Sequence, residues 1–488
     1  MLARLKSFFN PSDETRLLRR IFWTGFLVRA LYVTLAHTYR IRVAEDHFQF
    51  GWEAGRIVRA LLTGYGYSDP FANAFLAHTG PTAWLPPCYP LLLAGIFRLF
   101  GVYTHASAWV LFTLQSAFSA ATALATYQIA ARCFSRRVAL WSAWIWALYP
   151  AAMQYAVRWP WETTITTALF SFMLALSLRM RGVESGKWSV VSGKREGKQG
   201  KTLKTDSLTT YHLPLTTDWL YFGFLWGLIA LSNSTLLIFL PVCGLWILLP
   251  NLTQRSSPGT PSMQSHRRPG SPPASLVGWM GGIARALTGP TLAALVFLAL
   301  IAPWTLRNQR VFHAFIPLRG NFGAELFMGN GPGSNGFLME YYHPFQDPQQ
   351  LRDYATLGEV GYVARQSAAA RAFIAAHPAH FAADVARRAY FFWAGVPHPS
   401  DEAWYNEAGR TLNFAFISLA GLMGLVLALR HRIPAAGLFA CAFLLLPMPY
   451  YIVTVHARFR HPLEPLIAIL AVYLFQSAAR PRSPQRPD

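Results

Sequence analysis

The sequence predicts an all-α protein that crosses a membrane many times. Of its 488 residues, 53% are hydrophobic and only 13% are charged, whereas a soluble domain carries about 25% charged residues. The apolar residues are grouped into runs that are long enough to cross a bilayer as helices. The basic residues lie between these runs and favour one side of the membrane, which is the bias that orients membrane proteins.

About ten runs approach the length that a spanning helix needs, which is roughly 17 to 25 residues. They lie near residues 21–37, 106–131, 138–157, 162–178, 219–234, 235–250, 286–304, 412–429, 435–455 and 462–477. The first run follows a group of arginines but lacks a clear cleavage site, so we predict a retained signal anchor. The predicted fold is a polytopic bundle of about 10 (10–12) transmembrane helices.

The distribution of charge predicts which segments face outside. With the N-terminus inside, residues 38–105 and 307–410 lie outside, and we call them the first outer loop and the second outer segment. Every lysine of the chain then falls on the inside. This topology explains the formal net charge of +21 without nucleic acid, which we exclude as a partner. The bilayer itself is the predicted surrounding.

The two outer stretches divide the chain into three predicted regions. These are an N-terminal transmembrane region (1–304, with outer loop 38–105), an outer helical region (305–410), and C-terminal transmembrane helices with a basic tail (411–488). The outer stretches are predicted to carry short helices near residues 52–62, 351–376 and 378–392. The apolar stretch 91–101 is too short to span and is predicted to lie in the membrane interface.

Acidic residues of the outer face are candidates for general-base chemistry. Glu45, Asp46 and Glu53 follow the first apolar run, and Asp46 and Glu53 would share a helix face if a helix reached that far. Glu162 lies in the short outer connection 158–162, at the membrane edge. Solvated surface charge and a favourable charge at a helix N-terminus are the plain alternatives for these acids.

Arginines of the outer face are candidates for binding a phosphate, because the guanidinium fork can donate to two phosphate oxygens at once. Arg458 and Arg460 are close together, and Glu464 follows them within the first turn of the last predicted span. The predicted substrate-binding set is Glu45, Arg56, Arg158, Arg307, Arg319, Arg458, Arg460 and Glu464. Snorkelling of the arginines to lipid headgroups is the alternative.

Three segments of the chain resemble the GT-C superfamily, specifically glycosyltransferase family 39-like and RgtA/B/C/D-like membrane enzymes. The segments are GWEAGRIVRALLTGYGYSDPF with TGPTAWLPPCYPLLLAGIFRLFG, APWTLRNQRVF with LFMGNG, and ARFRHPLEPLIAIL. The resemblance implies a GT-C-type bundle, a polyprenyl-phosphate-linked sugar donor, and an inverting transfer to a lipid, glycan or protein acceptor. It also implies a multi-pass protein of the bacterial cytoplasmic (inner) membrane whose active site faces the periplasm.

The same resemblance implies a catalytic carboxylate in the first outer loop and a second acid in the next outer loop. These correspond to Asp46 or Glu53, and to Glu162. Many relatives have an adjacent Asp-Glu pair shortly before the helix, whereas this chain has Phe50-Gly51 near that place. The choice between Asp46 and Glu53 therefore stays open.

Other classes of function have weaker support in the sequence. The four cysteines are far apart without a CxxC pair, and His456 and His461 lack the spacing of metal ligands, so no metal residue is assigned. No cofactor is predicted with certainty, and dependence on a divalent cation is left open. A transporter or flippase of lipid-linked sugars is the main alternative function, although the inverted repeats typical of transporters are not visible in the sequence.

Overall fold

The structure is a computed structural model that describes residues 13–41, 50–183, 216–256, 276–337, 342–396 and 404–479. These residues fold almost entirely into helices, with one isolated β-bridge between Ser68 and Pro81. The α-helices are α2 (Asp13–Leu35), α3 (Glu53–Leu62), α4 (Cys88–Phe100), α5 (His105–Cys133), α6 (Arg136–Leu148), α7 (Pro150–Val157), α8 (Thr163–Met180), α9 (Thr216–Ser232), α10 (Leu240–Ser256), α11 (Leu276–Phe312), α12 (Phe322–Asn330), α13 (Pro348–Ala376), α14 (Pro378–Ala394), α15 (Trp404–Arg430), α16 (Ala436–Leu445), α17 (Met448–Ile452) and α18 (Glu464–Ala478). Two 3₁₀ helices, η1 (Ser234–Phe239) and η3 (Ala457–Leu463), lead into α10 and α18. The all-α prediction is confirmed for the described residues.

Each predicted apolar run forms helix, but several runs are interrupted. The run 138–157 is divided into α6 and α7 at Tyr149, directly before Pro150. The run 435–455 is divided into α16 and α17 beside Pro447. Proline lacks the backbone N–H that continues a helix and crowds the preceding turn, so both breaks have a local cause.

Four helices in the described part of the chain are long and apolar enough to cross a bilayer. They are His105–Cys133, Thr163–Met180, Leu287–Phe312 and Glu407–Arg430. Shorter apolar helices occur at Cys88–Phe100, Ser234–Leu249 and Ala436–Ile452. The protein is therefore an integral membrane protein by its helices, whereas the count of about ten spans stays a prediction.

Helix α5 packs against α2, α6 and α8, while α18 packs against α15 and α6. Arg29 of α2 is completely buried and donates to the carbonyl oxygens of Gly25, Trp146 and Ala147. Trp146 and Ala147 end α6, where carbonyl groups lack helical partners. A charged side chain within the first predicted span thus caps a neighbouring helix.

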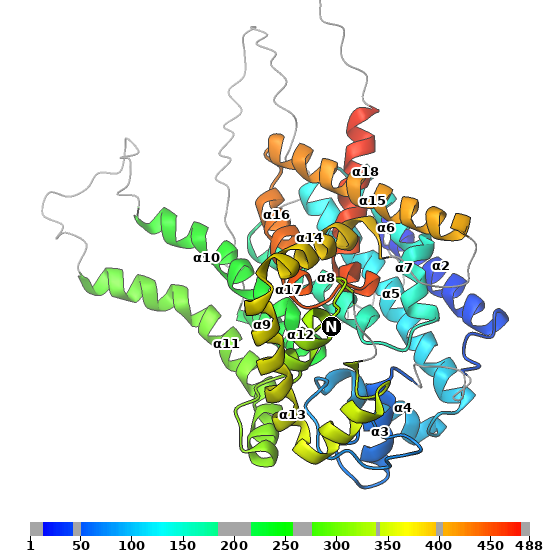
Figure 1. Cartoon of the computed structure of the whole chain (residues 1–488). Coiled ribbons are helices and arrows are strands. Elements are labelled where there is room, and N and C mark those ends of the chain that lie inside the picture. The colour runs from blue at the N-terminus through cyan, green and yellow to red at the C-terminus, as the bar shows by residue number, and fades with distance from the viewer. Residues whose placement is uncertain are drawn as a thin grey trace, which may run out of the picture.

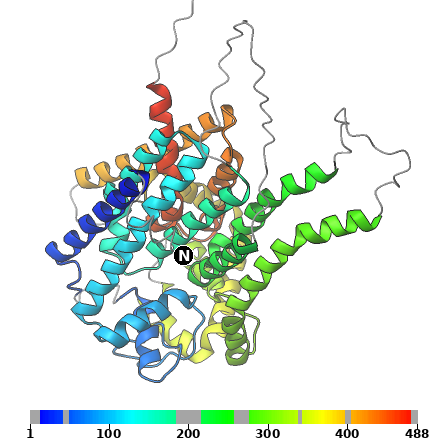
Figure 2. The same ribbon diagram turned by 180° about the vertical axis from the view of Figure 1, so that it is seen from behind.

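Helices α10 and α11 run outward from the bundle, side by side, in both views (Figures 1 and 2). Leu287, Leu295, Leu298 and Leu306 of α11 are each about half exposed. Apolar side chains exposed along a long helix suit contact with lipid tails. This part of the molecule therefore faces the hydrocarbon, as the sequence predicts for residues 286–304.

At the opposite end from the α18 C-terminus, the two outer stretches pack on each other (Figure 1). The predicted short helices are present as α3, α13 and α14, and α13 is kinked at Gly358, where φ is +67°. Phe71 and Trp84 of the first outer loop share a buried cluster with Tyr354 and Tyr362 of α13. This cluster holds the first outer loop beside the second outer segment.

Candidate active site

The turn before α3 places the first outer loop against the connection 158–162. Phe50, Gly51 and Trp52 all have positive φ angles, of 64°, 91° and 55°. A Cβ atom at Gly51 would overlap with the carbonyl oxygen of Pro160, so only glycine allows this approach. The helix begins at Glu53 and cannot extend back through these residues, so one helix does not carry both Asp46 and Glu53 as the sequence spacing would allow. Asp46 and Glu45 lie outside the described residues.

Glu53 lies in the first turn of α3 and is mostly buried, with 17% of its side chain exposed. Its Oε1 atom lies 3.3 Å from Nε2 of His343, and the two side chains form a hydrogen bond. Burial alone would raise the pKa of Glu53, but the hydrogen bond from His343, together with the charge of Arg319, holds the pKa below its ordinary value. Glu53 is therefore a carboxylate at neutral pH.

Glu162 precedes the first residue of α8, at the end of the short connection that contacts Gly51. Gln115 of α5 fixes this connection by donating to the carbonyl oxygens of Trp159 and Trp161, at 3.2 and 2.8 Å. Burial and the charge of Glu162 both raise the pKa of Tyr89, so the carboxylate lies close to the start of α4. The connection that carries Glu162 thus lies beside the turn that precedes Glu53.

Arg458 lies on the aromatic pair of the same connection. Its guanidinium carbon is 4.0 Å from the ring centre of Trp161, which stacks on Trp159 at 4.8 Å. The Nε–H of Arg458 is buried without a hydrogen-bond partner in the described residues. The sequence predicts that Arg458 binds a phosphate. The residue is partly exposed, and a guanidinium held in position by an aromatic ring has the chemistry that phosphate binding requires.

Arg307 and Arg319 both donate to backbone carbonyl groups of the first outer loop. Arg307 donates to Thr82 and Tyr67, each at 2.7 Å, and Arg319 donates to Trp84 at 2.9 Å. Arg319 also pairs with Glu325 at 3.1 Å. These two predicted phosphate ligands therefore have a visible role in holding the loop, and the charge of Arg319 still reaches Glu53.

A buried glutamate that the sequence analysis did not single out completes this junction. Glu359 of α13 accepts hydrogen bonds from the hydroxyl of Thr82 (2.5 Å), the N–H of Ala83 (2.7 Å) and the hydroxyl of Tyr354 (2.8 Å). Burial raises the pKa of Glu359, against the opposing effect of these three donors and Arg307. Thr82 and Glu359 are far apart in sequence, so nothing local in the chain indicates their pairing.

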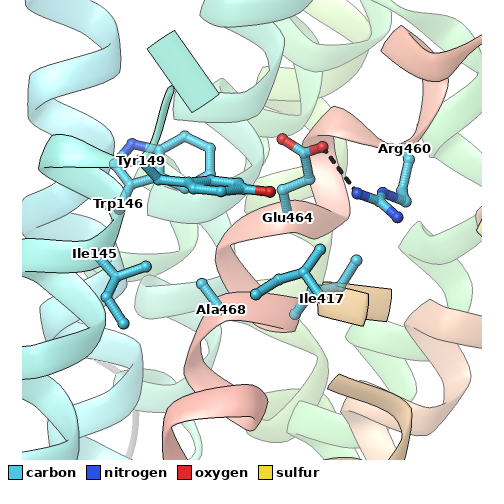
Figure 3. A pocket seen from close by; sticks show the side chains of 8 residues that line it. Ile145, Trp146, Tyr149, Ile417, Arg460, Glu464 and Ala468 are labelled. Atoms are coloured by element: carbon cyan, nitrogen blue, oxygen red, sulfur yellow. Dashed lines mark hydrogen bonds and ion pairs between the residues drawn. The ribbon is translucent and has the colours of Figure 1, made fainter. Parts of the chain in front are cut away.

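Arg460 and Glu464 line a separate, very small cavity of about 10 Å³ (Figure 3). Arg460 pairs with Glu464 at 3.4 Å and also donates to Ser418 of α15. Figure 3 shows the hydroxyl end of Tyr149 pointing toward Glu464. The cavity is lined by Ile145, Trp146, Tyr149, Ile417, Arg460, Glu464, Ile467 and Ala468. Arg458 and Arg460 thus contact different elements.

The remaining predicted ligands have different surroundings. Arg56 is buried in α3, donates to the carbonyl of Ala72 and lies 4.0 Å from the ring centre of Phe345, and burial lowers its pKa to about 10. Arg158 is exposed at the C-terminal end of α7. Among the described residues, no three His, Cys, Asp or Glu side chains form a group that could hold a metal ion.

No protein-family model matches the chain, and no curated protein matches it. Among solved structures, it is similar to the oligosaccharyltransferase of Archaeoglobus fulgidus in the apo form, at 13% identity and a TM-score of 0.48 over 96% of this chain and 51% of that chain. It is similar to AglB of the same organism, in complex with an inhibitory peptide and a dolichol-phosphate, at 14% identity and a TM-score of 0.43 over 93% and 50%. This chain spans about half the length of these two structures.

A third similar structure is ArnT from Cupriavidus metallidurans bound to undecaprenyl phosphate. The match has 14% identity and a TM-score of 0.38, and it covers 96% of this chain and 79% of that chain. AglB and ArnT are members of the GT-C superfamily.

Proposed function

We propose that the chain is a membrane glycosyltransferase that moves a sugar from a polyprenyl-phosphate donor to an envelope acceptor on the periplasmic face. The observation that supports this proposal is the contact between the turn before α3 and the connection 158–162, two segments that each carry an acid with a guanidinium group nearby. Glu53 interacts with Arg319, and Glu162 adjoins the Trp161 on which Arg458 lies. The contact between Gly51 and Pro160 joins the two pairs.

These groups suit an inverting displacement. A carboxylate removes the proton of the acceptor hydroxyl or amine, and the acceptor atom attacks the anomeric carbon while the bond from that carbon to the phosphate oxygen breaks. Glu53 and Asp46 are the candidates for this base, and Glu162 orients the acceptor. The low pKa of Glu53 favours a base that is ionised at neutral pH.

The leaving phosphate gains negative charge, so cations that are already in position stabilise it. Arg458 is the best-placed candidate because its contact with the Trp161 ring restrains the guanidinium while the residue stays partly exposed. Arg319, a third exposed, is the second candidate. The polyprenyl chain would lie along apolar helices in the bilayer, which accounts for the placement of this chemistry in a membrane protein.

The proposal is tested with purified protein and a panel of synthetic polyprenyl-phosphate hexoses and pentoses, with envelope extract as the source of acceptor. We expect one donor to release polyprenyl phosphate in proportion to the protein added, and mass spectrometry of envelope glycans from a deletion strain to show a missing sugar. Uptake of a lipid-linked sugar into vesicles, without release of polyprenyl phosphate from any donor, would instead favour a flippase.

A further inference from the structure

His343 lies where the first outer loop meets the second outer segment. Its ring contacts the rings of Trp52, Phe71 and Trp84 edge to face, at centroid distances of 5.7, 5.2 and 6.3 Å. Only 7% of the residue is exposed. The imidazole is therefore fixed on several sides by aromatic side chains of the first outer loop, and its single polar contact with that loop is with Glu53 among the described residues.

The hydrogen bonds of His343 determine which ring nitrogen carries the proton. The backbone N–H of Phe345 donates to Nδ1 at 3.2 Å, so Nδ1 holds a lone pair. In the neutral ring the proton must then be on Nε2, which lies 3.3 Å from Oε1 of Glu53. The imidazole therefore donates to the carboxylate.

From this geometry we infer that His343 is a positioning residue that orients the Glu53 carboxylate toward the acceptor and does not itself take the proton. The inference rests on the proposed function, in which Glu53 is a candidate base. Because Nδ1 is occupied by the N–H of Phe345, the ring has no free site for the proton that Glu53 accepts. His343 thus holds Glu53 by a single N–H bond, as the orienting member of a catalytic pair does.

The titratable and charged groups that act on Glu53 come from three places: the imidazole of His343 before α13, the guanidinium of Arg319 before α12, and the guanidinium of Arg56 in α3 itself. Burial raises the pKa of Glu53, and the hydrogen bond of His343 is the first of the effects that oppose it. Removal of the Nε2–H donor should therefore raise this pKa, and the acid limb of the pH–rate profile should move to higher pH.

Two substitutions of similar size separate orientation from packing. His343→Gln loses the ring but keeps an N–H near the Nε2 position, whereas His343→Asn keeps only an acceptor near the Nδ1 position. With the donor that turns over in the panel above, we expect His343→Asn to lower kcat by about 100-fold, because a misdirected base loses its geometry. His343→Gln should stay within about 5-fold of wild type and keep the wild-type acid limb.

If His343→Asn and His343→Gln lower kcat equally and leave the acid limb of the pH–rate profile unchanged, the inference about His343 is wrong. The proposed function would still hold in that case if Glu53→Gln were inactive. Full turnover in Glu53→Gln would instead overturn Glu53 as the base. A readout without substrate is the thermal melting of the single variants and of Glu53→Gln/His343→Asn at pH 7. We expect Glu53→Gln to lower the melting temperature of wild type but to raise that of His343→Asn, where the carboxylate has lost its donor. Identical effects in both backgrounds would also overturn the inference.

Discussion

At the scale of single residues, Glu53 and Glu359 show how environment changes one functional group. Both carboxyl groups are largely removed from water, which raises the pKa of each. At Glu53 the effect of His343 and Arg319 is larger, and the pKa falls below its ordinary value. At Glu359 burial dominates over three hydrogen bonds, and the pKa is raised. The environment of Glu53 suits a catalytic base, and that of Glu359 suits a buried structural contact.

The first prediction concerns the acids of the candidate site. Glu53→Gln keeps the shape of the side chain but removes the proton acceptor, so kcat should fall by about 100-fold to 10,000-fold if Glu53 is the base. Asp46→Asn belongs in the same series, because the sequence left both acids open. Glu407→Gln, in an outer acid that pairs with Arg410, is the matched control and should keep wild-type turnover. If Glu53→Gln and Asp46→Asn both stay active while Glu162→Gln is inactive, the base lies in the connection 158–162.

The second prediction concerns the arginines around η3. Replacing Arg458 and Arg460 together with alanine should raise the KM for the donor, and the single variants should separate two effects. Arg458→Ala removes an unsatisfied donor and should raise KM, with poor rescue by lysine, which lacks the planar fork. Arg460→Ala leaves Glu464 with His461 as its one remaining buried ionic partner among the described residues and should chiefly lower the melting temperature. An unchanged KM for the donor in a folded Arg458→Ala protein would show that Arg458 does not bind the donor phosphate.

At the scale of elements, the outer face depends on one junction between the first outer loop and α13. Arg307 of α11 donates to Thr82, whose hydroxyl donates to Glu359. Tyr354 and the N–H of Ala83 donate to the same carboxylate. Three segments that are remote in sequence are thereby fixed together. This network adds to the hydrogen bonds within the first outer loop, where Asp69 accepts from the N–H groups of Thr79 and Gly80.

The third prediction tests this junction through Glu359→Gln. The amide turns one acceptor into a donor that faces existing donors, so unfolding should become easier by about 1–3 kcal/mol. Tyr354→Phe, which removes only one hydrogen bond, is the milder comparison and should cost about 1 kcal/mol. Thermal melting in detergent measures both. Equal stability of Glu359→Gln and wild type would show that the network contributes little.

The raised pKa of Glu359 also makes the contribution of this junction to stability depend on pH in a defined direction. A folded acid with a raised pKa binds more protons than the unfolded chain between the ordinary and the raised pKa, so its contribution to stability falls as pH rises through that window. The ordinary pKa of glutamic acid is about 4.3. The melting temperature of wild type should therefore fall relative to Glu359→Gln as pH rises from that value. Parallel curves would contradict the shift.

At the scale of the whole molecule, charge and apolar surface together describe a protein oriented in a bilayer. The half-exposed leucines of α11 require lipid, and the net charge of +21 includes lysines that all fall in segments assigned to the inside. Of the carboxylates of the candidate site, Glu53 belongs to the first outer loop, and Glu162 belongs to the connection 158–162 that contacts this loop at Gly51. The chemistry is therefore expected on the side away from the lysines.

The fourth prediction tests this orientation by labelling single cysteines in intact cells. An impermeant thiol reagent should label a cysteine at Gln346, an exposed position of the second outer segment, but not one at Ser192, in an inside loop. Cys133 and Cys243 are buried, and Cys88 and Cys441 are partly exposed, so a variant with these four replaced gives the background. Lysed cells provide the positive control for Ser192. Labelling of Ser192 alone in intact cells would reverse the topology.

The sequence by itself determined the class of the molecule and the places of its helices. Apolar runs predicted α5, α8, α11 and α15 because length and hydropathy are local properties. The short helix predicted near residues 52–62 is present as α3, which ends at Leu62, because helix-ending preferences of the backbone act over a few residues. The sequence also indicated Glu53, Glu162 and Arg458 as chemically suitable groups. It could not rank them, since suitability alone does not place side chains relative to one another.

The tertiary structure alone decided which of these groups have partners. It brought His343 to Glu53 and Glu359 to Thr82, pairs that are separated by most of the chain. It also placed Arg458 on Trp161 and Arg460 on α15, although only one residue separates them. The physical reason is that hydrogen bonds and ionic effects act over a few ångströms in space, so they depend on how helices and loops pack rather than on spacing along the chain.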